Sequence, residues 1–148
     1  MAFHFTLEVL LRYRQSLEDT EHLHLRARFA EQAALLHELR RTADSRLAFE
    51  TAIGDALRAT PVPAAEVRSS AARLTGIAHQ QELLQQQLQQ VRARIAQQTE
   101  RYWRARQRRE TLQSLRNRQV GEYRLQQRRR DQAAIDEIHL LRAHRRWA

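Results

Sequence analysis

The stretch from Leu74 to Leu112, LTGIAHQQELLQQQLQQVRARIAQQTERYWRARQRRETL, decides the fold because its apolar residues recur at alternating intervals of three and four. One set of positions repeats every seven residues from Leu74, and a second set follows three residues later from Ile77. The two sets are Leu74, Gln81, Leu88, Ile95, Tyr102 and Arg109, and Ile77, Leu84, Val91, Gln98, Ala105 and Leu112. Nine of these twelve residues are apolar or aromatic, a pattern that is typical of a left-handed coiled coil.

The chain's two prolines, Pro61 and Pro63, lie between two long helical patterns. Proline lacks an amide hydrogen and disfavours the helical conformation of the residue before it, so the first helix must end before Pro61. The sequence predicts an all-α fold: two long helices that form an antiparallel coiled-coil hairpin, the second longer than the first. The expected boundaries are about 5–58 for the first helix, 59–63 for the hinge and 64–145 for the second, within a single domain over residues 1–148.

The first segment carries a rougher apolar seam, whose register slips between intervals of three and four. Its residues are Phe29, Ala33, Leu36, Ala43, Leu47, Ile53 and Leu57. Folding the chain back at the prolines pairs residues whose numbers sum to roughly 124, which sets Leu36 beside Leu88 and Arg12 beside Leu112. Residues after about 120 then have little of the chain left to pair with.

Composition supports long helices and argues against sheet folds. Hydrophobic residues reach 42% but aromatic residues only 6%, and 29% of the residues are charged. Sheets need more β-branched and aromatic residues and more turn residues than this chain has.

Charge is unevenly distributed between the two halves. All 26 basic residues are Arg; residues 1–60 hold 8 of them against 9 acidic residues, whereas residues 61–148 hold 18 against 8. The second half is therefore expected to face an acidic partner, whether protein, nucleic acid or anionic lipid. The chain has no Cys, no apolar run of membrane-spanning length and no signal-peptide pattern at its start, which favours a cytoplasmic protein without a transmembrane segment.

The most basic region, Arg92 to Arg130, holds 13 Arg against three acidic residues. A solvated coiled-coil face explains it as well as a binding surface does. A nucleic-acid-binding basic coiled coil is the alternative, but basic leucine zippers place the basic region before the heptads, and here it overlaps and follows them.

An apolar stripe of Ala133, Ala134, Ile135, Ile138 and Leu141 lies near the end of the chain. Two readings stand side by side: the stripe docks into a partner, or it packs on the residues near Phe3 and Leu10. Neither metal nor cofactor is expected, because the seven His residues lack ligand spacing and Cys is absent. No catalytic motif occurs and a two-helix hairpin offers no enclosed pocket, so the sequence argues against an enzyme.

Three stretches carry a family resemblance. They are Phe3-x-Phe5-x-Leu7-Glu8-x-Leu10-Leu11-Arg12-x-Arg14; Trp103-Arg104, Arg108, Leu112-Gln113, Leu115 and Arg118-Gln119; and Asp131-Gln132-x-x-x-Asp136-Glu137-Ile138. In order and spacing they resemble the FliJ family of bacterial flagellar export proteins, over essentially the whole chain. The related stalk of a virulence type III secretion system remains an alternative.

The resemblance implies a soluble, cytoplasmic component of the flagellar type III export apparatus, peripherally associated with the inner membrane. In this family the coiled coil is a stalk that inserts into the export ATPase ring, promotes ring assembly and activity, and links the ring to the cytoplasmic domain of the export gate. Members also escort export chaperones. A monomeric hairpin without nucleic acid is the expected form, and a homodimeric coiled-coil spacer is a further alternative.

Carried onto this sequence, the resemblance assigns ring contacts to the paired end of the coil and gate contacts to the hairpin end. The expected ring-binding residues are Arg12, Arg14, Arg104, Arg108, Gln113, Arg118, Gln119, Asp131, Gln132, Asp136 and Glu137. The expected gate-binding residues are Arg46, Phe49, Ile53, Arg73 and Ile77.

Overall fold

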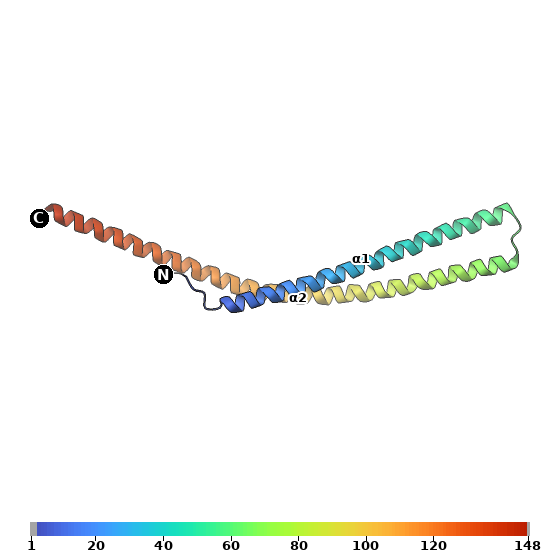
Figure 1. Ribbon diagram of the computed structural model, residues 1–148, viewed down its shortest axis with the longest axis horizontal. Helices are drawn as coiled ribbons and strands as arrows, with labels where there is room; N and C mark the ends of the chain where they lie inside the picture. Colours follow the sequence, from blue (N-terminus) through green and yellow to red (C-terminus); the bar gives the residue numbers. More distant parts are fainter. Residues whose placement is uncertain (1–2, 148) are drawn as a thin grey trace. The chain divides into compact units, whose positions relative to one another are not determined.

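The computed structural model describes residues 3–147, with side chains as far as Arg145. Two helices account for this part of the chain: α1, Glu8–Ala59, and α2, Ala64–Trp147 (Figure 1). They contain 52 and 84 residues, and the described residues include no strand. The all-α class and the longer second helix are confirmed.

The start of α1 is set by a buried aromatic residue. Phe5 is only 4% exposed, and its carbonyl accepts a hydrogen bond from the Glu8 amide at 3.1 Å. The helix therefore begins at Glu8 rather than near residue 5. Glu8 in the first turn and Arg58 in the last turn both have the charge that the helix dipole favours.

The interruption between the helices lies at the two prolines. The Thr60 amide still donates to the Ala56 carbonyl at 3.3 Å, but residues 61–63 are not helical. The Pro63 carbonyl then accepts the Glu66 amide at 3.0 Å and the Val67 amide at 3.3 Å, which starts α2. Because proline can occupy a first helical turn but not a helix interior, the prolines end one helix and allow the next to begin directly.

The chain divides into two compact units, each containing a part of both helices. The hinge unit is Thr20–Tyr102; the terminal unit combines the start of the chain up to Asp19 with the segment from Trp103 onward. In the hinge unit the two helices run side by side in opposite directions on either side of the proline turn (Figure 1). That residues 1–148 form a single domain stays a prediction.

The seam of α2 in the hinge unit follows the predicted heptads. Leu88 and Val91 are 6% and 3% exposed, and Gln98 is 7% exposed although it is polar. The other heptad positions of this unit are half-buried: Leu74, Ile77, Gln81, Leu84, Ile95 and Tyr102. A spacing of three and four therefore brings each of these residues to the helix partner, as the pattern requires.

Cross-helix contacts confirm the predicted antiparallel register near a sum of 124. His22 and Tyr102 have ring centroids 5.6 Å apart, with a sum of 124. Arg94 lies 3.9 Å from Glu31 in an ion pair, with a sum of 125. In the terminal unit, Arg116 Nε lies 3.2 Å from a Glu8 carboxylate oxygen, again with a sum of 124.

The predicted seam of α1 is only partly confirmed. Phe29 and Leu47 are 49% and 64% exposed, and Ala33 and Ala43 are exposed as well, whereas Leu36 and Ile53 are half-buried. Leu57 is 54% exposed and lines, with Ile53, a pocket that Val67 and Leu74 of α2 also line. The residues that face α2 lie one position earlier and are buried or half-buried: Leu25, Arg28, Gln32, Leu35, Leu39 and Thr42. This face keeps the intervals of three and four without a slip, but it mixes leucines with charged and polar residues, so a search for apolar residues alone followed the neighbouring face.

In the terminal unit, Phe5 and Leu11 are the buried apolar residues, at 4% and 3% exposure. The rings of Phe3 and Tyr123 meet at 5.7 Å between centroids. Half-buried positions continue beyond the apolar heptads at Leu112, Arg116, Gln119 and Tyr123. The contact surface of α2 thus extends past Leu112 with polar residues, while every described side chain from Arg128 to Arg145 is exposed.

Leu88→Ala and Leu47→Ala separate the two possible seams. Leu88 is 6% exposed, so its truncation should lower the free energy of unfolding by about 2 kcal/mol or more. Leu47 is 64% exposed, so its truncation should change it by less than about 0.5 kcal/mol. Thermal and urea unfolding followed by circular dichroism measures both; equal losses would contradict the observed burial of α1.

Candidate protein-interaction site

Two ion pairs join α1 to α2 in the terminal unit. Arg109 donates to both carboxylate oxygens of Glu18, at 2.6 and 3.2 Å, and these side chains are 24% and 15% exposed. Arg116 Nε donates to Glu8 at 3.2 Å. Both arginines occupy seam positions where a coiled coil ordinarily places apolar residues, so the carboxylates of α1 compensate charge that would otherwise be poorly solvated.

The two hydrogen bonds from Arg109 to Glu18 affect the pKa of the Arg109 guanidinium. The side-chain hydrogen bond to Glu18 raises the pKa of Arg109, while partial burial acts in the opposite direction. Glu110 also lies 3.7 Å from Arg109, and a hydrogen bond from Arg106 lowers the pKa of Glu110. Arg109 therefore stays charged at any physiological pH.

Trp103 begins the segment of α2 that belongs to this unit. It is 55% exposed, and the Arg106 guanidinium lies 5.1 Å from its ring centroid. Arg106 also donates to Glu110 at 2.7 Å. An aromatic face with an arginine across it gives this side of α2 a wide, partly apolar surface suited to a protein partner.

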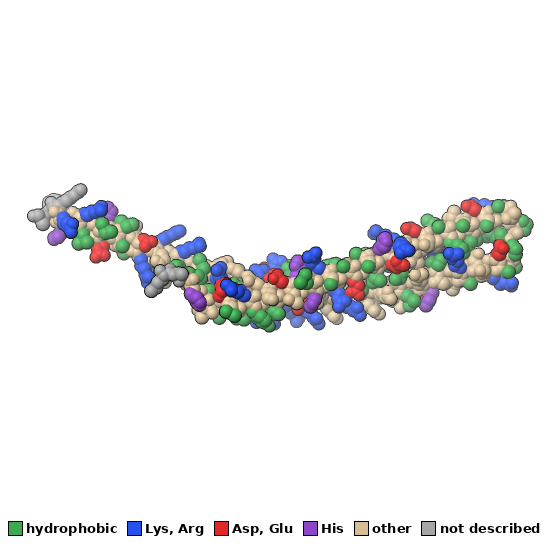
Figure 2. Space-filling model, viewed as in Figure 1, with side chains coloured by type: hydrophobic (Ala, Val, Ile, Leu, Met, Phe, Trp, Pro, Cys, Tyr) green, Lys and Arg blue, Asp and Glu red, His purple; other side chains and the backbone are tan. Residues whose placement is uncertain are grey.

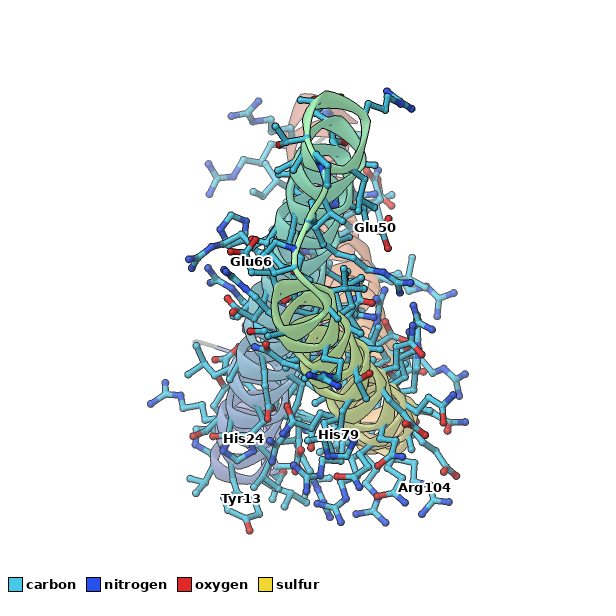
Figure 3. The ribbon with its side chains drawn as sticks, turned by 90° about the vertical axis from the view of Figure 1, so that its right-hand side faces the viewer. Tyr13, His24, Glu50, Glu66, His79 and Arg104 are labelled. Atoms are coloured by element: carbon cyan, nitrogen blue, oxygen red, sulfur yellow. The ribbon has the colours of Figure 1, made fainter. Side chains whose placement is uncertain are left out.

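Seven of the expected ring-binding residues lie where the start of α1 and α2 are paired. Arg12 is exposed and lies 3.6 Å from Glu8, and Arg14 is half-buried beside the Tyr13 ring. On α2, Arg104, Arg108 and Arg118 are exposed, whereas Gln113 and Gln119 are half-buried. Figure 3 shows the labelled Tyr13 and Arg104 side chains pointing outward, away from the helices.

The other four expected ring-binding residues, Asp131, Gln132, Asp136 and Glu137, lie elsewhere on the helix. All four are exposed, and Gln132 donates to Asp136 at 2.9 Å within α2. They follow Tyr123, which already contacts Phe3 at the start of the described chain. They therefore belong to the part of α2 that has no described segment opposite it, and not to the paired end.

The apolar stripe near the end of α2 is uncovered. Ile135, Ile138 and Leu141 are 48%, 49% and 60% exposed. The alternative that they pack on the start of the chain is therefore wrong. A shallow groove lined by Ile138, Leu141, Arg142 and Arg145 lies on this segment, so apolar and cationic groups occur together there.

Arginines without acidic partners line α2 in the terminal unit. Among the described residues, none forms an ion pair with Arg108, Arg118, Arg124 or the run 128–130. Figure 2 shows arginines and acidic residues intermixed on the surface. The excess of unpaired cations on α2 is the electrostatic property that a partner would meet first.

The expected gate-binding residues all lie in the hinge unit. Arg73 stands 4.4 Å over the Phe49 ring, which brings α2 and α1 together. Arg46 donates to Glu50 at 2.8 Å and to Gln81 at 3.3 Å. Ile77 lines a groove on the side of Glu38 and Gln80, and Ile53 lines a separate pocket beside the hinge.

The pocket beside the hinge was missed by the sequence analysis. It is lined by Ile53, Ala56, Leu57, Val62, Glu66, Val67, Ser70, Ala71 and Leu74. Leu57 and Val67 are 54% and 45% exposed, because the proline turn separates the helix ends and the apolar side chains cannot close over one another. Val62, an apolar residue between two prolines, is the one signal in the sequence that could have indicated this pocket.

The described chain has neither a membrane-spanning helix nor a cluster of metal-ligating side chains. No helix there is both long and apolar enough to cross a bilayer. Within residues 3–147 no three His, Cys, Asp or Glu side chains lie close enough together to hold a metal ion.

Comparison with known proteins gives one match. A family model described as "Flagellar FliJ protein" matches residues 3–147. No curated protein and no solved structure matches the chain.

The pair of Glu18 and Arg109 should contribute measurably to the stability of the terminal unit. In a double-mutant cycle with Glu18→Gln and Arg109→Gln, we expect a coupling free energy of about 1 kcal/mol, since both groups are largely shielded from solvent. Arg46→Gln with Glu50→Gln, an exposed pair on one helix, is the matched control and should give about 0.4 kcal/mol. Unfolding at low and high salt measures both coupling free energies. A Glu18–Arg109 coupling no larger than that of the control pair would show that this ion pair does not hold the two helices together.

Proposed function

Because this chain belongs to the FliJ family, and is thus a component of the flagellar type III protein export apparatus, we propose that it is the coiled-coil stalk of the export ATPase ring. In this role it inserts into the ring, promotes ring assembly and hydrolysis, and couples the ring to the export gate. The exposed, unpaired arginines of α2 in the terminal unit are the observation that carries the proposal.

Arginines of this kind suit a stalk because a stalk must hold its ring without being fixed to one orientation. Each exposed ion pair contributes little, from about 0 to 1 kcal/mol, and can be exchanged for a neighbouring one. Arg108 and Arg118, about three turns apart on α2, would meet acidic side chains of the ring in this way.

The ring-binding surface has two parts in this proposal. The paired part includes Arg12, Arg14, Arg104, Arg108, Gln113, Arg118 and Gln119, and the following part of α2 includes Asp131, Gln132, Asp136 and Glu137. The second part adds the exposed stripe of Ile135, Ile138 and Leu141, which gives the ring an apolar contact beside the charged ones.

The hinge unit is assigned to the export gate. The apolar pocket beside the prolines includes Ile53, and Arg73 over Phe49 supplies a partly apolar cationic surface nearby. The cytoplasmic domain of the gate would contact Arg46, Phe49, Ile53, Arg73 and Ile77. We also assign to the chain the escort of export chaperones.

The proposed mechanism is non-enzymatic and requires no cofactor. The protein transmits force and orientation between the ring and the gate through helix packing and surface charge. It works in the cytoplasm, at the inner-membrane face of the export apparatus.

Titration of the purified chain into its own organism's flagellar export ATPase tests this function. At near-physiological salt we expect faster hydrolysis and more rings at substoichiometric amounts of the chain, because one stalk serves one ring. Hydrolysis and ring formation are followed together, the latter by electron microscopy. No stimulation, with both proteins folded, would remove the stalk function. Duplex DNA and a virulence-type export ATPase then test two of the alternatives, and sedimentation tests the third, a homodimeric coiled-coil spacer.

Charge-reversal variants locate the contact. Arg108→Glu with Arg118→Glu should raise the concentration for half-maximal stimulation about tenfold or more, since two attractive contacts become repulsive. Arg68→Glu, the same change at an exposed arginine of the hinge unit, is the matched control and should act like the unchanged chain. Asp136→Ala and Gln113→Ala should also impair stimulation while helicity and melting stay the same; a parallel loss of helicity would mean that these residues act on the fold.

A further inference from the structure

A second heptad stripe on α1 faces solvent in the hinge unit. It contains five of the seven residues predicted for the seam of the first helix, together with charged residues at the same spacing. Its members are Arg26, Phe29, Ala33, Leu36, Arg40, Ala43, Leu47 and Glu50. Seven of the eight are exposed and Leu36 is half-buried, so α2 leaves this stripe largely uncovered.

The stripe is largely self-complementary about residue 38. In an antiparallel pair of such stripes Ala33 would lie opposite Ala43 and Phe29 opposite Leu47, whereas Leu36 would lie opposite Arg40. At the ends, Arg26 would lie opposite Glu50, a residue of opposite charge that also accepts a hydrogen bond from Arg46 of its own helix at 2.8 Å. Any eight consecutive heptad positions pair with themselves in this way when two identical helices pack antiparallel about a two-fold axis, so the residue types in each pair, and not the constant sum of 76, carry the complementarity.

The adjoining face of α2 can be identified from the contacts on the other side of the helix pair. Glu31 with Arg94, and the groove lined by Glu38, Ser45 and Gln80, define one flank of the seam. On both helices the residues that come one position after each seam residue lie on the opposite flank. This flank therefore contains the stripe of α1 and a matching stripe of α2. The α2 stripe is Thr75, Ala78, Glu82, Gln85, Gln89, Arg92, Ala96 and Thr99.

The α2 stripe is self-complementary as well, about residue 87. Gln85 matches Gln89, Glu82 matches Arg92, and Ala78 matches Ala96, with Thr75 and Thr99 at the ends. Every pair sums to 174, and the one charged pair again joins opposite signs. In the described chain neither Glu82 nor Arg92 has an ion-pair partner.

The two centres lie at the same level of the helix pair. Residues 38 and 87 sum to 125, the same sum as the observed pair of Glu31 and Arg94. A single two-fold axis through this level would therefore relate both helices of one copy to both helices of another.

We propose that this face binds a second copy of the chain, so that two hinge units form an antiparallel four-helix assembly. Two Arg26–Glu50 pairs and two Glu82–Arg92 pairs would form across it, around Phe29–Leu47 and Ala33–Ala43 contacts. A parallel arrangement would set Arg26 against Arg26 and Arg92 against Arg92, which like-charge repulsion disfavours. Leu36 and Arg40 lie at the centre of the α1 stripe, and Gln85 and Gln89 lie at the centre of the α2 stripe.

The size of the face sets the strength of the association. The matched residues span 25 positions of each helix, or about 37 Å, with eight residues from each helix. This is fewer than the roughly 20–30 residues a side of a standard stable interface. The dimer is therefore in equilibrium with the monomer that the sequence analysis expected, and this self-association goes beyond the proposed stalk function.

Sedimentation equilibrium measures the association directly. The weight-average mass should rise from 17.5 kDa toward twice that value as concentration increases. Phe29→Glu and Leu47→Glu should each raise the dissociation constant at least tenfold, and circular dichroism should show unchanged helicity because both side chains are exposed. A mass of 17.5 kDa at every concentration up to the millimolar range would overturn the proposal.

Disulfide cross-linking tests the antiparallel register. Because the chain has no native Cys, only the introduced cysteines can form a disulfide. A mixture of the Ala33→Cys and Ala43→Cys chains should oxidise to a disulfide-linked heterodimer, whereas either chain alone should not, since equal positions would lie about 15 Å apart. The control mixture is Ala27→Cys with Ala48→Cys, which sum to 75 but lie on another face of α1. Equal cross-linking in the control, or efficient cross-linking of Ala33→Cys alone, would contradict the register.

A charge exchange on α2 provides an independent test. Glu82→Arg and Arg92→Glu should each weaken the dimer about tenfold, and the double variant should restore it, because the opposite-charge pair re-forms with its signs reversed. Failure of the double variant to recover would exclude this pair from the interface. ATPase stimulation by the same variants should stay unchanged, so that loss of the dimer and loss of the stalk function are separately visible.

Discussion

The packing of α1 against α2 along one shared face is the constraint on which the rest of the structure depends. Among the described residues only Phe5, Leu11, Leu88 and Val91 are buried apolar side chains. A helix that has one neighbour can bury only one face, so both units are stabilised by many half-buried contacts and not by a central core. Any charge on that face must find its partner on the opposite helix, as Arg109 does with Glu18.

This constraint divides the charged residues between structure and function. In the terminal unit the carboxylates of Glu8 and Glu18 form ion pairs with Arg116 and Arg109, respectively, on the seam. The arginines on the outer side of α2, such as Arg108 and Arg118, are left without acidic partners in the described chain. The surplus of positive charge in the second half of the sequence therefore becomes an exposed surface, to which an acidic partner is the natural complement.

The two proposed surfaces lie in different units and make different demands. Ring contact uses α2 from Trp103 onward, where exposed arginines and an uncovered apolar stripe occur on one helix. Self-association uses the exposed flank of the hinge unit, where both helices contribute and the order of residues is symmetric. Much of the proposed ring surface was predicted from the sequence, and its ring contacts stay a prediction; what the sequence supports is that arginines such as Arg108 and Arg118 are exposed. That Asp131 to Glu137 lie beyond the paired segment, and that Ile53 lines a pocket apart from Ile77, required the positions of both helices.

The sequence by itself determined the two helices, the proline turn and the antiparallel register, because heptad spacing and proline geometry act locally along the chain. It also determined the excess of arginine in the second half. Only the tertiary structure decided which face of α1 meets α2. Phe29 and Leu47 form the more apolar stripe, yet Leu25, Arg28 and Leu35 face the partner helix. The physical reason is that a polar seam residue is stabilised by a residue on the other helix. The residue pattern of one helix alone does not identify that partner.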